Sequence, residues 1–103
     1  MGKDLTVEQA YVAAARIGLG LLATIKHELG DLDRIKRVVQ VTGLVNSPAE
    51  FSQHPAVING VSDLLVSVLG EAGKHTRVAA GYSNLPLNCA VEASMIVEVD
   101  DSQ

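Results

Sequence analysis

The sequence predicts an α+β fold, in which two helices pack on one face of a β-sheet within a single domain over residues 1–103. Three observations predict it. Sequence patterns follow one another in the order helix, strand, helix, strand, strand, which is typical of helices segregated to one side of a sheet. Hydrophobic residues make up 48% of the chain and charged residues 19%, so the chain is too apolar to be disordered. At this length one compact core is expected.

The first helix is expected to begin after Thr6 and to end at Gly30. Thr6 and Gln9 have the spacing of a capping box, which satisfies free N–H groups at a helix start. The apolar residues that follow recur at helical intervals and so share one face; they are Val7, Ala10, Ala14, Ile17, Leu21, Ile25 and Leu29. Gly18 and Gly20 weaken a helix intrinsically. We therefore expect them to allow a close approach to a sheet.

A strand and a second helix are expected next. The stretch from about Ile35 to Val45 is rich in β-branched residues, which favour strands. The second helix should start near Pro55, because proline is favoured in the first turn, and end at Gly70 or Gly73. Its buried face should consist of Val57, Ile58, Val61, Leu64, Leu65 and Val68.

Two strands are expected to close the chain, from about Thr76 to Tyr82 and from about Cys89 to Val99. Between them we expect a turn at Asn84, Leu85 and Pro86. Side chains alternate between the two faces of a strand. In the last strand, the set that suits the helices is Val91, Ala93, Met95, Val97 and Val99.

Arg77 is the unusual residue of the strand before it. The alternation places Arg77 on one face with Ala79 and Gly81, whose small size leaves room for a ligand beside a guanidinium. We expect this face, with Ser94 and Ile96, to lack a helix of its own and to be buried by association of several copies. His75 shares the face of Arg77. Without further context, the favoured interpretation of Arg77 is a strand-end arginine paired with a surface acid.

Composition restricts the partners. The net charge is -4, aromatic residues are 3% and tryptophan is absent, so nucleic acid is disfavoured. The single cysteine, Cys89, cannot form an internal disulfide. We see neither a membrane-spanning apolar run nor a signal peptide, and expect a soluble, cytoplasmic protein without a membrane partner. His27, His54 and His75 lack metal-ligand spacing, so no metal site is expected.

The segment TRVAAGYSNLPLNCAVEASMIVEV resembles the C-terminal signature of the YjgF/RidA family, the reactive intermediate imine/enamine deaminases also called endoribonuclease L-PSP. In that signature an arginine opens a strand, a Leu-Pro pair follows and a Val-Glu pair begins the last strand. The residues here are Arg77, Leu85 with Pro86, and Val91 with Glu92. Residues 4–73 are similar to the helix, strand and helix of the family, so the resemblance covers nearly the whole chain.

The resemblance implies a chorismate-mutase-like fold, assembled as a homotrimer with clefts between subunits. It also implies hydrolysis of reactive 2-imino or enamine acids to 2-keto acids and ammonia, with no metal or cofactor. Arg77 matches the arginine that holds the substrate carboxylate. Glu92 matches the catalytic glutamate that positions the attacking water or moves its proton. Asn59 matches a second-helix asparagine near the cleft, and so is a substrate-binding candidate.

The sequence departs from the family pattern in two places. Family members normally have strands before the first helix that contribute to the cleft, whereas this sequence starts at the helix, so we expect either a truncated form or a downstream start. Ala79 stands where many members carry cysteine. The alternative function is a non-catalytic trimeric module that binds a small carboxylate or a protein partner. A third, weaker one is a ribonuclease or translation inhibitor, which the acidic balance disfavours. The natural substrate stays open.

Overall fold

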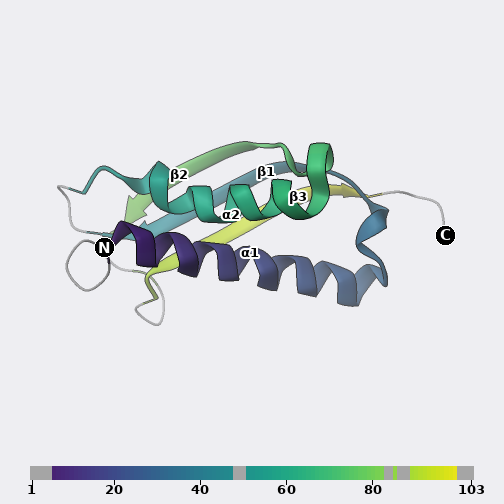
Figure 1. Ribbon diagram of the computed structural model, residues 1–103, viewed down its shortest axis with the longest axis horizontal. Coiled ribbons are helices and arrows are strands. Elements are labelled where there is room, and N and C mark those ends of the chain that lie inside the picture. The colour runs from purple at the N-terminus through teal and green to yellow at the C-terminus, as the bar shows by residue number, and fades with distance from the viewer. Residues whose placement is uncertain (1–5, 48–50, 83–84, 86–88, 100–103) are drawn as a thin grey trace.

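The computed structural model describes residues 6–47, 51–82, 85 and 89–99 of the chain. The two helices lie side by side on one face of a three-stranded sheet, which confirms the predicted α+β fold (Figure 1). In chain order the elements are α1 (Val7–Leu29), a short 3-10 helix η1 (Leu32–Arg34), β1 (Ile35–Asn46), α2 (His54–Leu69), a second 3-10 helix η2 (Gly70–Gly73), β2 (Thr76–Tyr82) and β3 (Val91–Val99). Asn84 and Pro86, assigned to a turn, lie outside the described residues.

Both ends of α1 are fixed by the caps that the sequence predicts. The Gln9 backbone N–H donates to Thr6 Oγ1 over 3.1 Å, and the Thr6 N–H donates to Gln9 Oε1 over 2.9 Å, which forms the capping box. At the other end Gly30 adopts the left-handed conformation with φ 88° and donates to the Lys26 carbonyl over 2.7 Å. The helix boundaries were therefore predictable from local chemistry.

The sheet is mixed and has the order β2-β1-β3, with β1 parallel to β2 and antiparallel to β3. The parallel pair needs a long crossover connection, which α2 provides. The ladder between β1 and β3 has two irregularities, one between Ile35 and Arg37 and one between Val38 and Gln40, where β1 carries an extra residue. Such bulges shift the alternation. Ile35, Val38 and Val41 are consequently all buried although they are three residues apart.

The core lies between the sheet and the helices. Its buried members come from every main layer: Ala10, Ala14 and Leu22 of α1, Ile35, Val38, Val41 and Val45 of β1, Val57, Ile58, Val61 and Leu65 of α2, and Val91 of β3. Ala93, Met95 and Val97 pack against this cluster, as predicted for the last strand. Val68 differs from its predicted burial, because its side chain is 47% exposed at the end of α2.

The small residues of the helices serve a helix–helix contact, not the helix–sheet contact that the sequence suggested. A Cβ added at Gly18 would lie 2.8 Å from Leu64 Cδ2 of α2, whereas one added at Gly20 would meet nothing within 4 Å. The tightest approach is at Gly60 of α2, where a Cβ would overlap the backbone carbonyl oxygen of Tyr11 in α1. Glycine at position 60 therefore sets how closely the two helices pack.

The stretch His54–Gly73 is long and apolar enough to cross a membrane by length and composition alone. This stretch is not an unbroken apolar run, because polar residues such as Asn59 and Asp63 interrupt it. In the structure, α2 supplies Val57, Ile58 and Leu65 to the core, where each is fully buried. Val66 and Val68 of the same helix are exposed, at 37% and 47%.

Arg77 lies on the opposite face of the sheet from the one predicted, so that prediction was wrong. The parallel register places Arg77, Ala79 and Gly81 beside Val41, Gly43 and Val45, and these three β1 residues are buried beneath the helices. Arg77 therefore lies on the helix face, at its outer edge, and does not share a face with Ser94 and Ile96. Alternation shows which residues of one strand share a face, but not which face it is.

The small residues beside Arg77 make room for α2. A Cβ at Gly81 would overlap the imidazole of His54, the first residue of α2. The face of the sheet without helices instead carries Val78, Tyr82 and Ile96, which are 49%, 52% and 59% exposed. An apolar exposed face does exist, as the sequence suggested, but it is the opposite face from that of Arg77.

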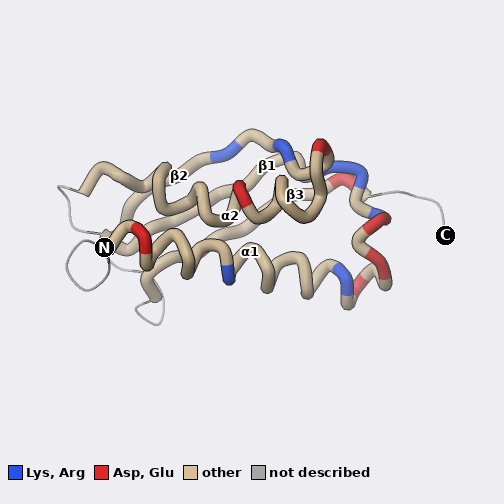
Figure 2. The backbone as a smooth tube through the Cα atoms, in the orientation of Figure 1, with Lys and Arg blue, Asp and Glu red and all other residues tan. Residues whose placement is uncertain are grey.

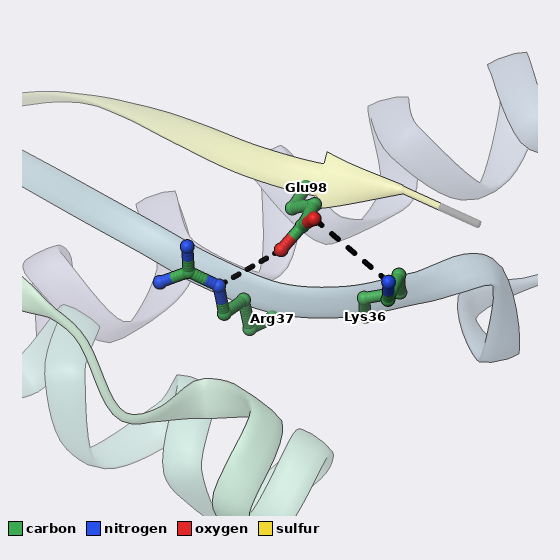
Figure 3. A network of polar contacts seen from close by, with 3 residues as sticks. All are labelled: Lys36, Arg37 and Glu98. Carbon is green, nitrogen blue, oxygen red and sulfur yellow. Dashed lines mark hydrogen bonds and ion pairs between the residues drawn. The ribbon is translucent and has the colours of Figure 1, made fainter. Parts of the chain in front are cut away.

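Acidic and basic residues are interleaved at the end of the molecule where α1, η1, β1 and β3 meet (Figure 2). Here Arg37 Nε donates to Glu98 Oε1 over 2.9 Å, and Lys36 Nζ lies 3.8 Å from Glu98 Oε2 (Figure 3). Two consecutive residues reach one carboxylate because the β1 bulge inserts Lys36 between the partners of Val99 and Glu98. The hydrogen bond from Arg37, and then the charge of Lys36, lower the pKa of Glu98 below 4.5.

This cluster predicts a small acid-dependent loss of stability. Folding lowers the pKa of Glu98 from its ordinary value of 4.5. The contribution of Glu98 to the stability of the fold is therefore present above pH 4.5, and it is lost as the pH falls through the pKa of the folded state. Glu98→Gln should therefore lower the melting temperature slightly near neutral pH, since exposed ion pairs contribute little. The difference from the parent should shrink at acidic pH. Thermal melts at both pH values measure it, and a difference that grows on acidification would contradict the assignment.

Candidate functional site

A cavity of about 300 Å³ opens between α2 and the edge strand β2. It is lined by Asn59, Ser62, Val66, Lys74, His75 and Arg77. Two of these side chains carry a fixed positive charge and a third, an imidazole, can gain one, while no acidic side chain lines the cavity. A cavity with this lining suits an anion. We call it the Arg77 cavity.

The residues that line the Arg77 cavity come from α2, from the connection that follows it and from β2. Asn59 and Ser62 are three residues apart on α2 and so project from the same side of the helix. The connection from α2 to β2 is tight, because a Cβ at Gly73 would overlap the carbonyl oxygen of Leu65. This tight connection brings Lys74 and His75 back beside the last turns of α2. Arg77 follows as the second residue of β2, on the helix face.

A directed network of hydrogen bonds runs through the cavity. The Arg77 guanidinium donates to Ser62 Oγ over 3.1 Å and to the Pro55 carbonyl oxygen over 3.3 Å. Ser62 Oγ lies 2.9 Å from His75 Nε2, and His75 Nδ1 lies 2.5 Å from the Gly73 carbonyl oxygen. A carbonyl oxygen can only accept, so Nδ1 carries a hydrogen and the Nε2 of a neutral imidazole accepts from the Ser62 hydroxyl.

No carboxylate neutralises Arg77 in the part of the chain that the structure describes. The ion pairs there join Lys36 and Arg37 to Glu98, and Lys74 to Glu71 over 2.8 Å. A guanidinium has five N–H groups. Among the described residues, Ser62 and Pro55 accept from two of those of Arg77. The alternative in which Arg77 simply pairs with a surface acid is therefore not what the described residues show.

The structure brings Asn59 to Arg77 but separates Glu92 from both. Asn59 lines the Arg77 cavity. Glu92 pairs with Leu44 in the sheet register, on the face without helices. It lines a second hollow of about 70 Å³ with Thr42, Leu44, Ala93 and Ser94. Within one chain the sheet thus stands between the predicted substrate-binding arginine and the predicted catalytic glutamate.

One carboxylate oxygen of Glu92 is buried without a partner. Oε1 is inaccessible to solvent and accepts no hydrogen bond from the described residues. A buried acceptor without a donor is costly, of the order of 1–3 kcal/mol. This oxygen is therefore a strong acceptor for any donor that reaches the hollow.

A second serine–histidine contact in the molecule has a structural role. Ser47 is buried, its hydroxyl donates to the Val45 carbonyl over 3.3 Å, and it lies 3.2 Å from His54 Nε2. The Phe51 ring packs edge-on against His54, with ring centres 5.1 Å apart. These contacts tie the end of β1 to the start of α2.

Sequence reasoning missed Ser62 and Lys74 and left His75 as a minor candidate. A signal was present for two of them. His75 shares the face of Arg77 by strand alternation, and Ser62 follows Asn59 by three residues on a helix. Lys74 could not be placed, because it precedes β2 and its direction depends on how tightly the chain turns at Gly73.

The chain is similar to a known protein family over nearly its whole length. Residues 1–99 match the family described as "YjgF/chorismate mutase-like, putative endoribonuclease". The chain belongs to the YjgF family. The chain is also 42% identical to Protein TCP17 of Trypanosoma cruzi over 102 residues, which cover 98% of this chain and 64% of that protein. The resemblance inferred from the sequence is thereby confirmed.

Two solved structures show the YjgF fold directly. The protein Atu1372 from Agrobacterium tumefaciens, described as of unknown function, is 44% identical with a TM-score of 0.95 over 97% of this chain and 64% of that one. A "putative endoribonuclease" from Shewanella oneidensis MR-1 is 34% identical with a TM-score of 0.91, over 95% and 65%. This YjgF chain therefore spans slightly less than two thirds of the length of each of these relatives. None of their descriptions mentions deamination.

Proposed function

We propose that this YjgF-family chain holds the carboxylate of reactive 2-imino or enamine acids, as part of a deaminase that hydrolyses them to 2-keto acids and ammonia. The observation that supports the proposal is the state of Arg77. Its guanidinium lines an open cavity, has no acidic partner among the described residues, and donates to Ser62 and Pro55 with two of its five N–H groups. A planar carboxylate accepts two parallel hydrogen bonds from such a group.

The dimensions of the Arg77 cavity favour a small acid. Its volume of about 300 Å³ is at the lower end of the range for small-molecule sites. Lys74 adds positive charge, although its ammonium is shared with Glu71. Asn59 offers an amide that can both donate and accept, which suits the nitrogen of an imine or enamine. No metal or cofactor enters this proposal.

Glu92 requires association of chains to act on a substrate held by Arg77. We therefore place the reaction in a homotrimer, in which the sheet face of one copy meets the β2 edge of the next. The apolar side chains Val78, Tyr82 and Ile96 on that face favour such burial. A repeated contact between two different surfaces closes into a ring when the rotation permits. A substrate or neighbouring donor there would satisfy Glu92 Oε1.

The alternative function is a non-catalytic module that binds a small carboxylate. The specific observation in its favour is the separation of Glu92 from Arg77 by the sheet. The family description names an endoribonuclease, but the support for ribonuclease activity is weaker for this chain. Its net charge of -4 and aromatic content of 3% provide neither a basic surface nor stacking platforms for RNA.

The test measures release of 2-keto acid from an imino acid that is generated in the same solution. The parent chain should accelerate release above the buffer rate, and Arg77→Ala should abolish the acceleration. Arg37→Ala is the matched control, because that arginine pairs with Glu98 away from the cavity and should leave turnover intact. Absence of acceleration by the parent would overturn the deaminase. Benzoate binding without turnover would then support the module, and Arg77-dependent cleavage of RNA would support the ribonuclease.

A further inference from the structure

We propose that His75 is the acid–base group of the Arg77 cavity, and that a carboxylate binds there together with a proton on His75. Ser62 connects the two residues. This inference rests on the carboxylate site proposed above, and concerns the group that carries protons in it. The family resemblance gave Glu92 two alternative roles, positioning the attacking water or moving its proton. Glu92 lies on the other face of the sheet in the same chain, so here the Glu92 of a neighbouring copy positions the water and His75 carries the proton.

The first step of the argument is the direction of the hydrogen bonds. The Gly73 carbonyl fixes a hydrogen on His75 Nδ1, so that the lone pair of a neutral imidazole is at Nε2. Nε2 lies 2.9 Å from Ser62 Oγ, which in turn accepts from Arg77 over 3.1 Å. With His75 neutral, the Ser62 hydroxyl proton is therefore directed to the imidazole. It is not available to a ligand.

Protonation of His75 changes what Ser62 offers. Both ring nitrogens then carry hydrogens, and Nε2 donates to Ser62 Oγ. Oγ can accept from both His75 and Arg77, because a hydroxyl oxygen has two lone pairs. The hydroxyl proton is released to turn into the cavity. A bound carboxylate thus gains the Ser62 hydroxyl as one further hydrogen-bond donor. Protonation of His75 and carboxylate binding at Arg77 are therefore coupled through Ser62.

The charges around His75 determine when that proton is favourable. From β2 it faces Arg77, and from the connection it faces Lys74, whose charge is partly compensated by Glu71. The α2 residues that line the cavity are uncharged, and Asp63 of that helix is bonded to Tyr11 of α1 over 2.7 Å.

Nor does β1 add an acid beside His75. Its residues next to the start of β2 are Val39, whose carbonyl accepts from Thr76 Oγ1 over 3.1 Å, and Gln40, which pairs with Thr76. A carboxylate bound at Arg77 would therefore supply the negative charge that a proton on His75 requires. Because coupling between two binding events is reciprocal, the proton must strengthen carboxylate binding by the same factor.

The same proton can perform the chemistry of an enamine acid. The Ser62 hydroxyl proton goes to the terminal carbon of the enamine, whose C=C electron pair forms the new C–H bond. The nitrogen lone pair forms the C=N bond, and Ser62 takes a proton from His75. The imidazole is now neutral, and it accepts a proton from water as the water oxygen bonds to the C=N carbon.

Collapse of the resulting amino alcohol restores the site. His75 gives its proton to the amino nitrogen, and the neighbouring hydroxyl returns a proton to His75 as the C–N bond breaks and the C=O bond forms. Ammonia and the 2-keto acid leave. His75 ends in its protonated starting state, so one water molecule is consumed and no oxidant or reductant is needed.

Calorimetry with benzoate or pyruvate tests the coupling without requiring turnover. Titrations of the full chain in two buffers of different ionisation enthalpy should show proton uptake on binding. The affinity of the parent should rise about fivefold or more between about pH 8 and about pH 6, the lower end of typical coupling factors. His75→Gln should still bind but take up no proton. His27→Gln, at an exposed position of α1, is the matched control and should behave as the parent.

Ser62→Ala is the second variant. It should weaken carboxylate binding at about pH 6 and reduce its pH dependence, because the hydroxyl donor is lost, and Ser62→Thr should restore both. Should His75→Gln fail to fold, the imidazole signal of His75 in the parent, followed by NMR against pH, should titrate at higher pH with benzoate than without.

Three results would overturn the inference. The His75→Gln variant could take up as many protons on binding as the parent, the parent could bind without taking up a proton, or the parent could bind neither benzoate nor pyruvate. Turnover with an unaltered pH profile in His75→Gln would overturn it and leave the deaminase intact. Coupled binding without imine turnover would leave it standing and remove the deaminase.

Discussion

Replacing Gly60 with alanine should destabilise the fold by about 3 kcal/mol, the upper end of the usual range for overpacked cores. The added Cβ would overlap the carbonyl oxygen of Tyr11, and it would also lie 3.0 Å from Ala14 Cβ and 3.1 Å from the Ala15 nitrogen. A backbone carbonyl cannot rotate away as a side chain can. Relief requires the helices to separate, which opens the core that α2 shares with α1.

The opposing effect is smaller. Alanine is favoured over glycine inside a helix by about 1 kcal/mol, so propensity offsets only part of the steric cost at position 60. Gly20→Ala is the matched control, since Gly20 is exposed in α1 and an added Cβ would meet nothing within 4 Å. It should stabilise the protein by up to about 1 kcal/mol. Urea unfolding of both variants measures the difference, and equal stability of Gly60→Ala and the parent would refute the close helix contact.

Arg77→Lys should weaken carboxylate binding by about 1–3 kcal/mol, although it keeps the positive charge. An ammonium is a point charge and cannot present the planar two-point contact of a guanidinium. A lysine that donated to Ser62 Oγ and the Pro55 carbonyl would keep one N–H for a ligand, whereas a guanidinium would keep three. Stability should barely change, because Arg77 is a partly exposed side chain and substitutions at such positions usually alter stability by less than about 0.5 kcal/mol.

Calorimetric titration with pyruvate, 2-oxobutyrate or benzoate measures the loss, and thermal melting measures the stability. Arg37→Lys is the matched control, since its guanidinium is paired with Glu98 and lies outside the cavity. It should bind these acids as the parent does. If Arg77→Lys markedly lowered the melting temperature and left binding intact, Arg77 would be a structural residue and the candidate site would be wrong.

The elements of the fold could be predicted because their signals are local. The capping box of Thr6 and Gln9 and the left-handed Gly30 fix α1 within a few residues of each end. The bounds of β2, Thr76 and Tyr82, agree with the prediction. The family could also be inferred, because the spacing of Arg77, the Leu-Pro pair and Glu92 is a property of the sequence itself.

The faces of the site could not be predicted, because they depend on pairings between distant residues. Whether Arg77 lies toward the helices is decided by its register with Val41, and the position of Glu92 by its register with Leu44. Both positions follow from how β1 pairs with β2 and with β3, and from which residues of β1 face the helices. No pattern within β2 or β3 alone indicates either of these. His75 and Ser62 come together only because the chain turns tightly at Gly73, which depends on contact with Leu65.

The central place of β1 has a consequence for how the chain folds. Both strands that pair with β1 come later in the sequence. On one side β2 can pair only after the α2 crossover, and on the other side the partner is β3, Val91–Val99. Closing these long loops costs entropy before the sheet returns any stability. The helices can form from local contacts, whereas the three-stranded sheet is complete only when Val91–Val99 has joined it. We therefore expect α1 and α2 to pair early in folding and β3 to join late.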